Sequence, residues 1–300
     1  MYDIIIIGAG PAGLTAGIYA GRNNKKVLIL EGSSFGGQII NSPNIENYPA
    51  LMGISCFDYS KNLYDQAISF GVEYINNKVV SINDYSDYKE VNTKNNTYKT
   101  KTIIIATGAS NRLLGIDREK ELTGKGVSYC ATCDGNFYKG KDVAVVGGGN
   151  TAVEDALYLS DIVNKVYVIL RRDEFRADPI LVEELKNKDN VEIIYNSKVV
   201  KLNGNDKLES ITVEGDSNTR DVVVSGIFVC IGRIPSTDIF EGLIDLDEYG
   251  YVVSSEDCHT NVDGIYVCGD VRTKTLRQLV TATSDGAIAA SEAIKYLNNK

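Results

Sequence analysis

Two cysteines, Cys130 and Cys133, are separated by two residues, and Asp134 follows directly. In a cytosolic chain this CxxC spacing indicates either redox chemistry or a metal site. Two thiols at this spacing close a small ring, so the oxidised and reduced forms interconvert with little backbone movement. One thiolate attacks the disulfide of a partner, and the other resolves the mixed disulfide that results. We assign the attack to Cys130, which begins the motif.

The residues around the pair favour redox chemistry over a metal. A structural zinc site takes four ligands, commonly two such pairs, and the chain has no second CxxC. Its one histidine, His259, lies far along the sequence. Asp134 is therefore the nearest group that could transfer protons to the sulfurs, provided that burial raises its pKa. The alternative for Asp134 is a structural cap of a helix or turn.

Two glycine-rich turns each follow an apolar run and open a helical stretch, as in a dinucleotide-binding β-turn-α-β unit. The first glycine makes the turn, the second lets a pyrophosphate approach the backbone, and the third permits close helix packing. The helix N-terminus then offers free N–H donors to the phosphates. The residues expected at these two turns are Gly8, Gly10, Pro11, Ala12 and Gly13 in the first, and Gly147, Gly149, Asn150, Thr151 and Ala152 in the second.

The second strands of the two units end differently, which predicts different nucleotides. Glu31 ends the first and can accept hydrogen bonds from ribose hydroxyls, as FAD or NAD requires. Arg171, Arg172 and Arg176 follow the second and suit a ribose 2′-phosphate, hence NADPH; the alternative is a solvated basic turn. A flavin accepts hydride and passes the electrons to a disulfide, so the first site most simply holds FAD. Because Cys130 is assigned to the partner, we expect Cys133 to face the flavin.

The wider sequence predicts an α/β fold with two Rossmann-like dinucleotide-binding domains. A length of 300 residues suggests two domains, and 28 glycines with 5 prolines suit α/β units with tight turns. Alternating segments at 72–82 and 88–98 are expected to be small antiparallel strands. Cys230 and Cys268 lie in apolar strand patterns and are interpreted as buried small hydrophobic residues.

Charge and hydropathy exclude several classes of function. The net charge of −9 argues against a general nucleic-acid role, which needs a basic face. No apolar run approaches the roughly 20 residues that span a bilayer. The first strand begins at once after Met1, without the basic and long apolar regions of a secretory signal, so we expect a cytoplasmic protein.

Taken in order along the chain, these motifs resemble the bacterial low-molecular-weight thioredoxin reductases. The match is nearly end to end and combines many separate motifs. Besides the two glycine turns, the motifs that carry the resemblance lie at 36–38, 46–49, 106–109, 130–135, 171–176, 269–270 and 277–278.

The resemblance implies a fold, cofactors and partners. It implies a three-layer (ββα-type) FAD domain from 1–112 plus 238–300, with an NADPH domain at 113–237 that carries the CxxC pair and is inserted into the first. It further implies a homodimer that reduces thioredoxin. The FAD site would also include Gly36, Gly37, Gln38, Asn47, Thr107, Gly108, Gly269, Asp270, Arg277 and Gln278.

The placement of the cysteines adds a prediction about motion. Cys133 lies shortly before Gly147, so the cysteines and the NADPH site share one domain. Both need the flavin of the other domain, and they cannot occupy the same face of it together. We therefore expect a domain rotation between the two half-reactions.

Some positions depart from the family pattern. Leu170 stands where the family has a histidine before its two arginines, and Lys125 stands where relatives often have an arginine that would help dock thioredoxin. The alternatives within the same fold are a ferredoxin-driven flavin thioredoxin reductase and a dithiol oxidase, both of which should lack a good NADPH site. A third is a flavoprotein that serves a peroxiredoxin or a thioredoxin-like partner.

Overall fold

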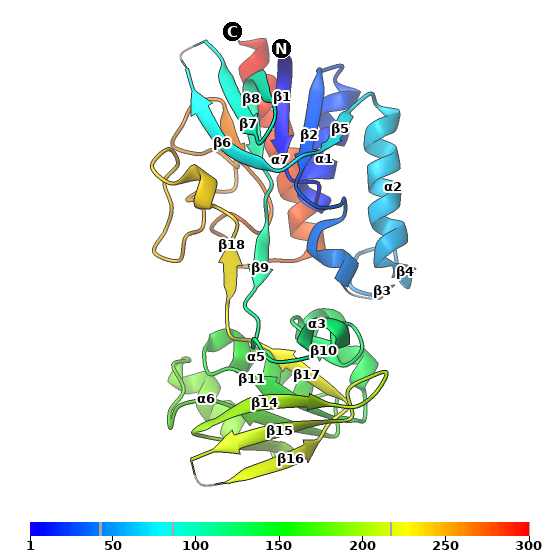
Figure 1. Cartoon of the computed structure of the whole chain (residues 1–300), viewed down its shortest axis with the longest axis vertical. Coiled ribbons are helices and arrows are strands. Elements are labelled where there is room, and N and C mark those ends of the chain that lie inside the picture. The colour runs from blue at the N-terminus through cyan, green and yellow to red at the C-terminus, as the bar shows by residue number, and fades with distance from the viewer. Residues whose placement is uncertain (42–43, 86, 217, 300) are drawn as a thin grey trace. The chain divides into compact units, whose positions relative to one another are not determined.

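The computed structural model describes residues 1–41, 44–85, 87–216 and 218–299 (Figure 1). The chain forms two compact units, one from Met1–Ser110 with Ile234–Lys300 and one from Asn111–Arg233, here called unit 1 and unit 2. The short strands β9 (Ala109–Asn111) and β18 (Arg233–Pro235) pair where the chain passes between the units. The expected boundaries at 112 and 237 lie two and four residues beyond the observed 110 and 233.

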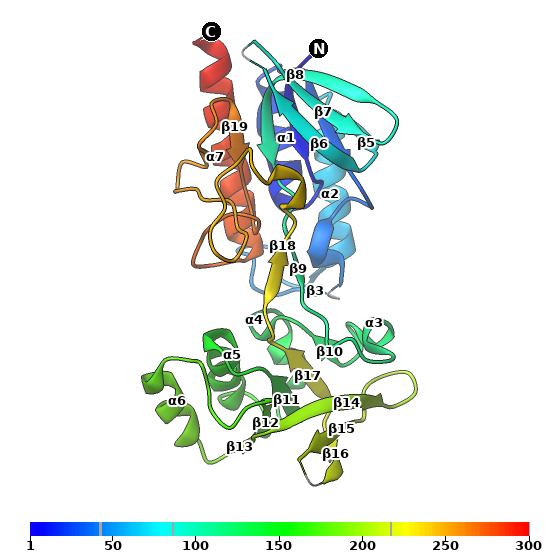
Figure 2. The ribbon, with the colours of Figure 1, turned by 60° about the vertical axis from the view of Figure 1, so that its left-hand side comes forward.

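Unit 1 is built on a sheet whose strand order is β5-β2-β1-β8-β7-β6, with β19 also paired to β8 (Figure 2). The strands β5, β2, β1, β8 and β19 are parallel, whereas β6, β7 and β8 form an antiparallel meander. The bounds are β1 (Tyr2–Ile7), β2 (Val27–Glu31), β5 (Glu73–Asn76), β6 (Val79–Asp84), β7 (Lys89–Thr93), β8 (Thr97–Ile105) and β19 (Ile265–Val267). The antiparallel prediction is thus right for β6 and β7 but wrong for β5, which pairs in parallel with β2.

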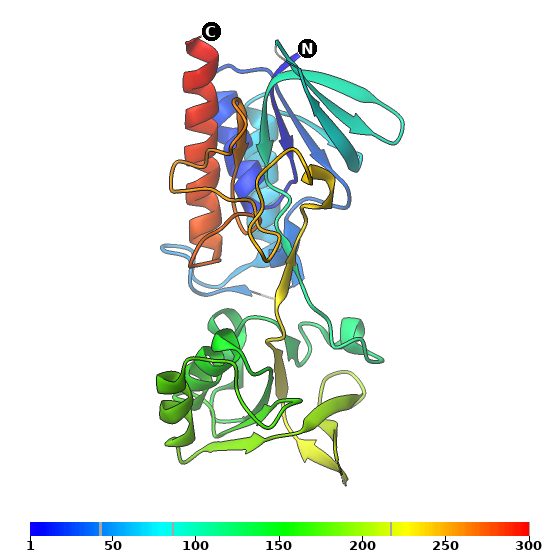
Figure 3. The ribbon, with the colours of Figure 1, turned by 90° about the vertical axis from the view of Figure 1, so that its left-hand side faces the viewer.

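The two faces of β1 bury different partners, because successive side chains of a strand point to opposite faces. Ile4 and Ile6 pack with residues of α1 (Pro11–Arg22) and α7 (Leu279–Asn298), while Ile5 and Ile7 pack with β6, β7 and the chain at 240–271. Figure 3 shows α7 on the opposite side of the parallel sheet from the β6–β7 hairpin. The remaining elements of unit 1 are η1 (Gly37–Asn41), β3 (Asn44–Ile45), β4 (Ile54–Ser55), α2 (Cys56–Ser69) and η3 (Asp238–Phe240).

Unit 2 repeats this three-layer plan. Its five-stranded parallel sheet has the order β10-β17-β11-β12-β13, and a three-stranded antiparallel sheet, β14-β15-β16, covers one face. The strands are β10 (Val127–Ser128), β11 (Asp142–Val146), β12 (Lys165–Ile169), β13 (Val191–Ile194), β14 (Ser197–Asn203), β15 (Ser210–Gly215), β16 (Thr219–Val223) and β17 (Gly226–Val229). The helices are α3 (Glu119–Leu122), α4 (Ala131–Asp134), η2 (Gly135–Tyr138), α5 (Asn150–Ser160) and α6 (Pro179–Lys186). The prediction of an α/β fold with two Rossmann-like units is confirmed.

A close helix contact fixes the position of α7 in unit 1. A Cβ added to Gly286 of α7 would lie 2.2 Å from the carbonyl oxygen of Ala12 in the first turn of α1. Only glycine permits this approach, so the C-terminal helix packs directly on the helix that follows the first glycine turn. In the described part of the chain, none of the helices has both the length and the apolar character needed to cross a membrane.

Candidate active site

Cys130 and Cys133 form a disulfide in unit 2, with an S–S distance of 2.08 Å and a Cα–Cα distance of 5.3 Å. Cys130 has extended backbone and precedes α4, whereas Cys133 lies within this one-turn helix. Both residues are partly exposed. The structure therefore brings the predicted redox pair together as a small closed ring at the start of a helix, where a partner's sulfur can approach it.

Asp134 is buried beside the disulfide, with 7% of its surface exposed. Its Oδ2 accepts a hydrogen bond of 2.6 Å from Oγ of Ser128, whose own oxygen accepts from the backbone N–H of Cys130 at 3.2 Å. Burial, with the nearby Asp134 carboxylate second, raises the pKa of Tyr138 to about 12. Ser128 thus links the carboxylate to the redox segment, and sequence reasoning missed it because a serine before CxxC carries no motif.

At the first position of both glycine turns, and at the third position of the first turn, neighbouring atoms leave no space for a side chain. Gly8 has φ +110° and Gly147 has φ +150°, and an added Cβ would lie 2.3 Å from the carbonyl oxygen of Ala106 or of Cys230 respectively. A Cβ on Gly13 would lie 2.0 Å from the Gly8 oxygen, so this residue permits close packing of the helix on the turn.

The middle glycine of each turn has no such neighbour. Among the residues that the structure describes, a Cβ on Gly149 would meet nothing within 4 Å, and one on Gly10 would meet only the Gly37 Cα at 4.0 Å. Packing within the protein therefore does not explain the missing side chain at either position. Bare backbone at the start of a helix fits a pyrophosphate that approaches the chain closely. The backbone of both turns therefore fits a dinucleotide.

Glu31 closes the loop beneath the first turn. Its Oε2 accepts from the backbone N–H of Ala9 at 2.8 Å, and its Oε1 accepts from the N–H of Ser33 at 2.9 Å. A carboxylate has about four acceptor positions, so two remain for ribose hydroxyls. The N–H of Gly36 donates to the Ala9 oxygen at 2.8 Å, which brings the predicted loop at 36–38 to the same turn. Gln38 lies in η1 of this loop.

Other predicted residues of unit 1 gather at the start of α7. Nδ2 of Asn47 donates to Oε1 of Gln278 at 3.0 Å. Arg277 places its guanidinium carbon 4.0 Å from the centre of the Tyr251 ring and donates from Nε to the Asp270 oxygen at 3.3 Å. Contacts within the protein therefore hold its side chain in place.

Thr107 and Gly108 follow β8 at the same edge of the sheet. Oγ1 of Thr107 donates to the Ser236 oxygen at 2.8 Å, and the Gly108 oxygen accepts from the Ser236 N–H at 3.0 Å. Gly269 follows β19 with φ +79°, and a Cβ there would lie 2.9 Å from that of Ala12. These residues line the carboxyl ends of the parallel strands, where ligands of open α/β sheets bind.

Arg171, Arg172 and Arg176 follow β12 and are all exposed. The backbone N–H of Arg176 donates to the Gly148 oxygen at 2.7 Å, so the arginine loop is attached to the second glycine turn. Within the described ranges, none of the three guanidinium groups has an ion pair or a hydrogen bond from its side chain. They are therefore available to bind an anion beside the turn.

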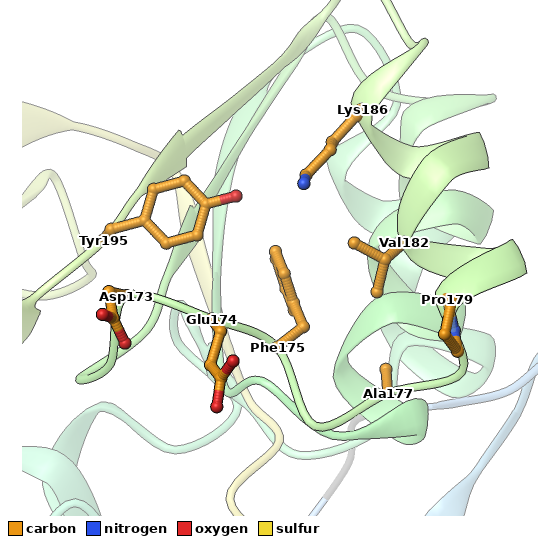
Figure 4. Close-up of a pocket in the computed structure, with 8 residues that line it drawn as sticks. All are labelled: Asp173, Glu174, Phe175, Ala177, Pro179, Val182, Lys186 and Tyr195. Carbon is orange, nitrogen blue, oxygen red and sulfur yellow. The ribbon is translucent and has the colours of Figure 1, made fainter.

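A pocket of about 240 Å³ lies on the same loop but contains none of the predicted site residues. Figure 4 shows the Phe175 ring near its centre, between Tyr195 and Val182. The lining residues are Asp173, Glu174, Phe175, Ala177, Pro179, Val182, Lys186 and Tyr195. Its two carboxylates make it a poor place for a phosphate.

The interpretation of Cys230 as a buried small residue is right for its packing but incomplete. The residue packs against the core cluster that includes α5, and its Sγ donates to Oδ2 of Asp155 on α5 at 3.1 Å. Burial, followed by the Asp155 carboxylate, raises the pKa of the Cys230 thiol well above its usual value. Cys230 is therefore a hydrogen-bonded thiol at the end of β17, whereas Cys268 is fully buried as predicted.

Comparison with known proteins agrees with this geometry. The family described as pyridine nucleotide-disulphide oxidoreductase matches residues 2–286. The thioredoxin reductase of Peptoclostridium acidaminophilum is 42% identical over 310 residues, covering 99% of this chain and 97% of the relative. That of Bacillus subtilis is 40% identical over 302 residues, covering 99% and 95%.

Solved structures give the same result. The thioredoxin reductase of Streptococcus pyogenes is 42% identical with a TM-score of 0.96, covering 100% of this chain and 99% of that one. The thioredoxin reductase of Giardia duodenalis is 37% identical with a TM-score of 0.93 and 99% coverage of both chains. The expected resemblance to bacterial thioredoxin reductases is confirmed. This chain belongs to the pyridine nucleotide-disulphide oxidoreductase family.

Proposed function

We propose that this protein is a thioredoxin-disulfide reductase that transfers hydride from NADPH to FAD and then reduces thioredoxin through Cys130 and Cys133. The observation that carries the proposal is the closed Cys130–Cys133 ring in a unit that also holds a complete second glycine turn. One chain thereby combines a disulfide with two dinucleotide turns. Electron transfer from a nicotinamide through a flavin to a disulfide needs these three sites.

In this proposal unit 1 binds FAD. When bound, FAD accepts a hydride and supplies two electrons to a disulfide. The bare backbone at Gly10 would receive its pyrophosphate, and Glu31 would accept from its ribose hydroxyls. The remaining FAD residues are those gathered at the carboxyl ends of the strands of unit 1, together with Arg277 and Gln278 at the start of α7.

Unit 2 binds NADPH at the second turn. The backbone at Gly149 would receive the pyrophosphate, and the unpaired arginines of the 171–176 loop would bind the 2′-phosphate. Leu170 takes the place of the family's histidine without removing these cations. A ferredoxin-driven enzyme or a dithiol oxidase would not need this turn, and its intact glycine geometry therefore favours the NADPH enzyme.

The reduced pair then exchanges with a protein disulfide. The thiolate of Cys130 attacks one sulfur of the partner, and the partner's other sulfur leaves as a thiolate. The thiolate of Cys133 attacks Cys130 in turn, which restores the Cys130–Cys133 bond and releases the second partner sulfur. Asp134, held by Ser128, exchanges protons with these sulfurs.

The proposal includes motion and assembly. The cysteines and the NADPH turn both lie in unit 2 and both have to reach the flavin of unit 1, so the units rotate between half-reactions. The resemblance to the family supports a cytoplasmic homodimer.

The proposal predicts a yellow protein whose flavin absorbance is bleached anaerobically by NADPH. It also predicts NADPH-dependent reduction of a thioredoxin disulfide, followed as NADPH consumption. Cys130→Ser is the control: it should lose thioredoxin reduction while NADPH still bleaches the flavin. A protein that takes up no flavin, or a Cys130→Ser variant that still reduces thioredoxin, would contradict the proposal.

A second prediction concerns the double variant Arg171→Ala/Arg172→Ala. Loss of two charge-assisted contacts to the 2′-phosphate should raise KM for NADPH by about tenfold or more. NADH lacks this phosphate, so its KM serves as an internal reference and should stay the same. Equal changes in both KM values would show that the arginines do not recognise the phosphate.

A third prediction concerns Asp134→Asn, which is similar in size and keeps an acceptor for Ser128. Removal of the acid should slow thioredoxin turnover by roughly 100-fold, the usual contribution of general acid–base catalysis. Anaerobic flavin reduction by NADPH should keep its wild-type rate, because it involves neither sulfur. Full thioredoxin turnover in this variant would assign Asp134 a purely structural part.

A further inference from the structure

Unit 1 contains a buried ionic cluster that neither glycine turn explains. It consists of Arg272, Lys274 and Asp285, whose side chains are 3%, 6% and 5% exposed, and we call it the Asp285 cluster. Nε and Nη2 of Arg272 donate to the two oxygens of Asp285, each at 2.9 Å. Nζ of Lys274 donates to Oδ2 of Asp285 at 2.7 Å. Two buried cations therefore share one carboxylate.

The same carboxylate oxygen also holds the backbone beside the first glycine turn. The N–H of Gly269 donates to Oδ2 of Asp285 at 3.0 Å. Gly269 packs on Ala12 in the first turn of α1, and Gly286, the residue after Asp285, packs on the Ala12 carbonyl. Asp285 thus ties α7 to the residue after β19, and both segments pack on Ala12 at the start of α1.

The charges of the cluster do not cancel. Burial alone would raise the pKa of Asp285, but hydrogen bonds from Arg272 and Lys274 outweigh it and lower the pKa, so the carboxylate is ionised at neutral pH. Arg272 donates otherwise to carbonyl oxygens, those of Ser255 at 3.2 Å and Thr273 at 3.0 Å. Among the described residues, Asp285 is the one carboxylate that pairs with either cation. The three side chains therefore sum to one positive charge, which the exposed Glu256 offsets only in part from outside the cluster.

We propose that Asp285 is a positioning residue for the cofactor of unit 1. Its carboxylate sets the Gly269–Asp270 backbone against the first glycine turn, and the surplus charge of its two cations favours an anionic dinucleotide there. The inference rests on the proposed function, because it takes FAD as the ligand of unit 1. A buried charge is tolerated only with partners, so the three side chains hold each other and the Gly269 backbone in one arrangement.

The test measures the affinity of the full-length apoprotein for FAD by quenching of flavin fluorescence. The thermal unfolding of each apoprotein is measured as well, so that a loss of affinity can be compared with a loss of stability. Asp285→Asn keeps an acceptor oxygen for the Gly269 N–H but removes the charge that orders both cations. It also raises the net positive charge of the cluster, which alone would favour FAD, so weaker binding reports the loss of positioning. The expected result is FAD binding weaker by about tenfold or more. Wild-type affinity in a folded Asp285→Asn apoprotein would overturn the inference.

The matched control is Lys89→Met. Lys89 is likewise buried and paired, with Asp84 at 2.6 Å, but lies in the β6–β7 hairpin of unit 1. Lys89 is opposite Thr100 of β8, which is opposite Tyr2 at the beginning of β1, so it lies at the end of the sheet away from the first glycine turn. It should destabilise the apoprotein and change FAD affinity by no more than about twofold. If both variants weaken FAD binding in proportion to their loss of stability, Asp285 is only structural and the inference is wrong.

A second variant keeps the inference testable if Asp285→Asn does not fold. Lys274→Met leaves Asp285 bonded to Arg272 and Gly269 and removes the surplus charge. It should weaken FAD binding by roughly fivefold, and unchanged affinity would overturn the inference. The wild type distinguishes failure of the proposed function from failure of this inference. A wild-type apoprotein that binds no FAD contradicts the proposed function. Wild-type binding with unaffected variants contradicts only the role of Asp285.

Discussion

The structure depends on one steric constraint, which is that the backbone of each glycine turn touches the end of a neighbouring strand. Gly8 lies against the carbonyl that follows β8, and Gly147 lies against the carbonyl that follows β17. Any side chain at either position would push the turn off the sheet. With the turn held there, the next glycine presents bare backbone at a helix N-terminus, where phosphates bind well. Two such contacts in one chain allow two dinucleotides.

The redox segment is built on the second of these turns. The helix α5 begins just after Gly149, and a Cβ on Gly135, at the end of the CxxC segment, would lie 3.0 Å from Tyr158 and 3.1 Å from Leu159 of that helix. The disulfide is therefore positioned by the same helix that begins at the nucleotide turn. Ser128 and Asp134 add a hydrogen-bonded carboxylate from the other side. Unit 2 thus combines a nucleotide turn with a closed pair of sulfurs, and the flavin proposed for unit 1 is the remaining component of the proposed pathway.

The sequence predicts features whose cause is local, and misses those made by distant segments. The two β-turn-α-β units and the cysteine pair follow from spacing over a few residues, so they are predictable from the chain alone. Strand β5 was mispredicted because its direction of pairing is decided by β2, some forty residues earlier. Ser128, the Cys230–Asp155 bond and the Asp285 cluster also join separate elements, and no local pattern marks them. They are visible only once the fold has brought the elements together.

The most direct test of the account is the electron capacity of the purified flavoprotein, measured by anaerobic reductive titration. FAD and the Cys130–Cys133 disulfide each take two electrons, so the account predicts about four electrons per chain. Replacement of either cysteine by serine should reduce this to about two. A wild-type capacity of two electrons, unchanged when the cysteines are replaced, would show that the sulfurs do not accept electrons from the flavin and would contradict the account.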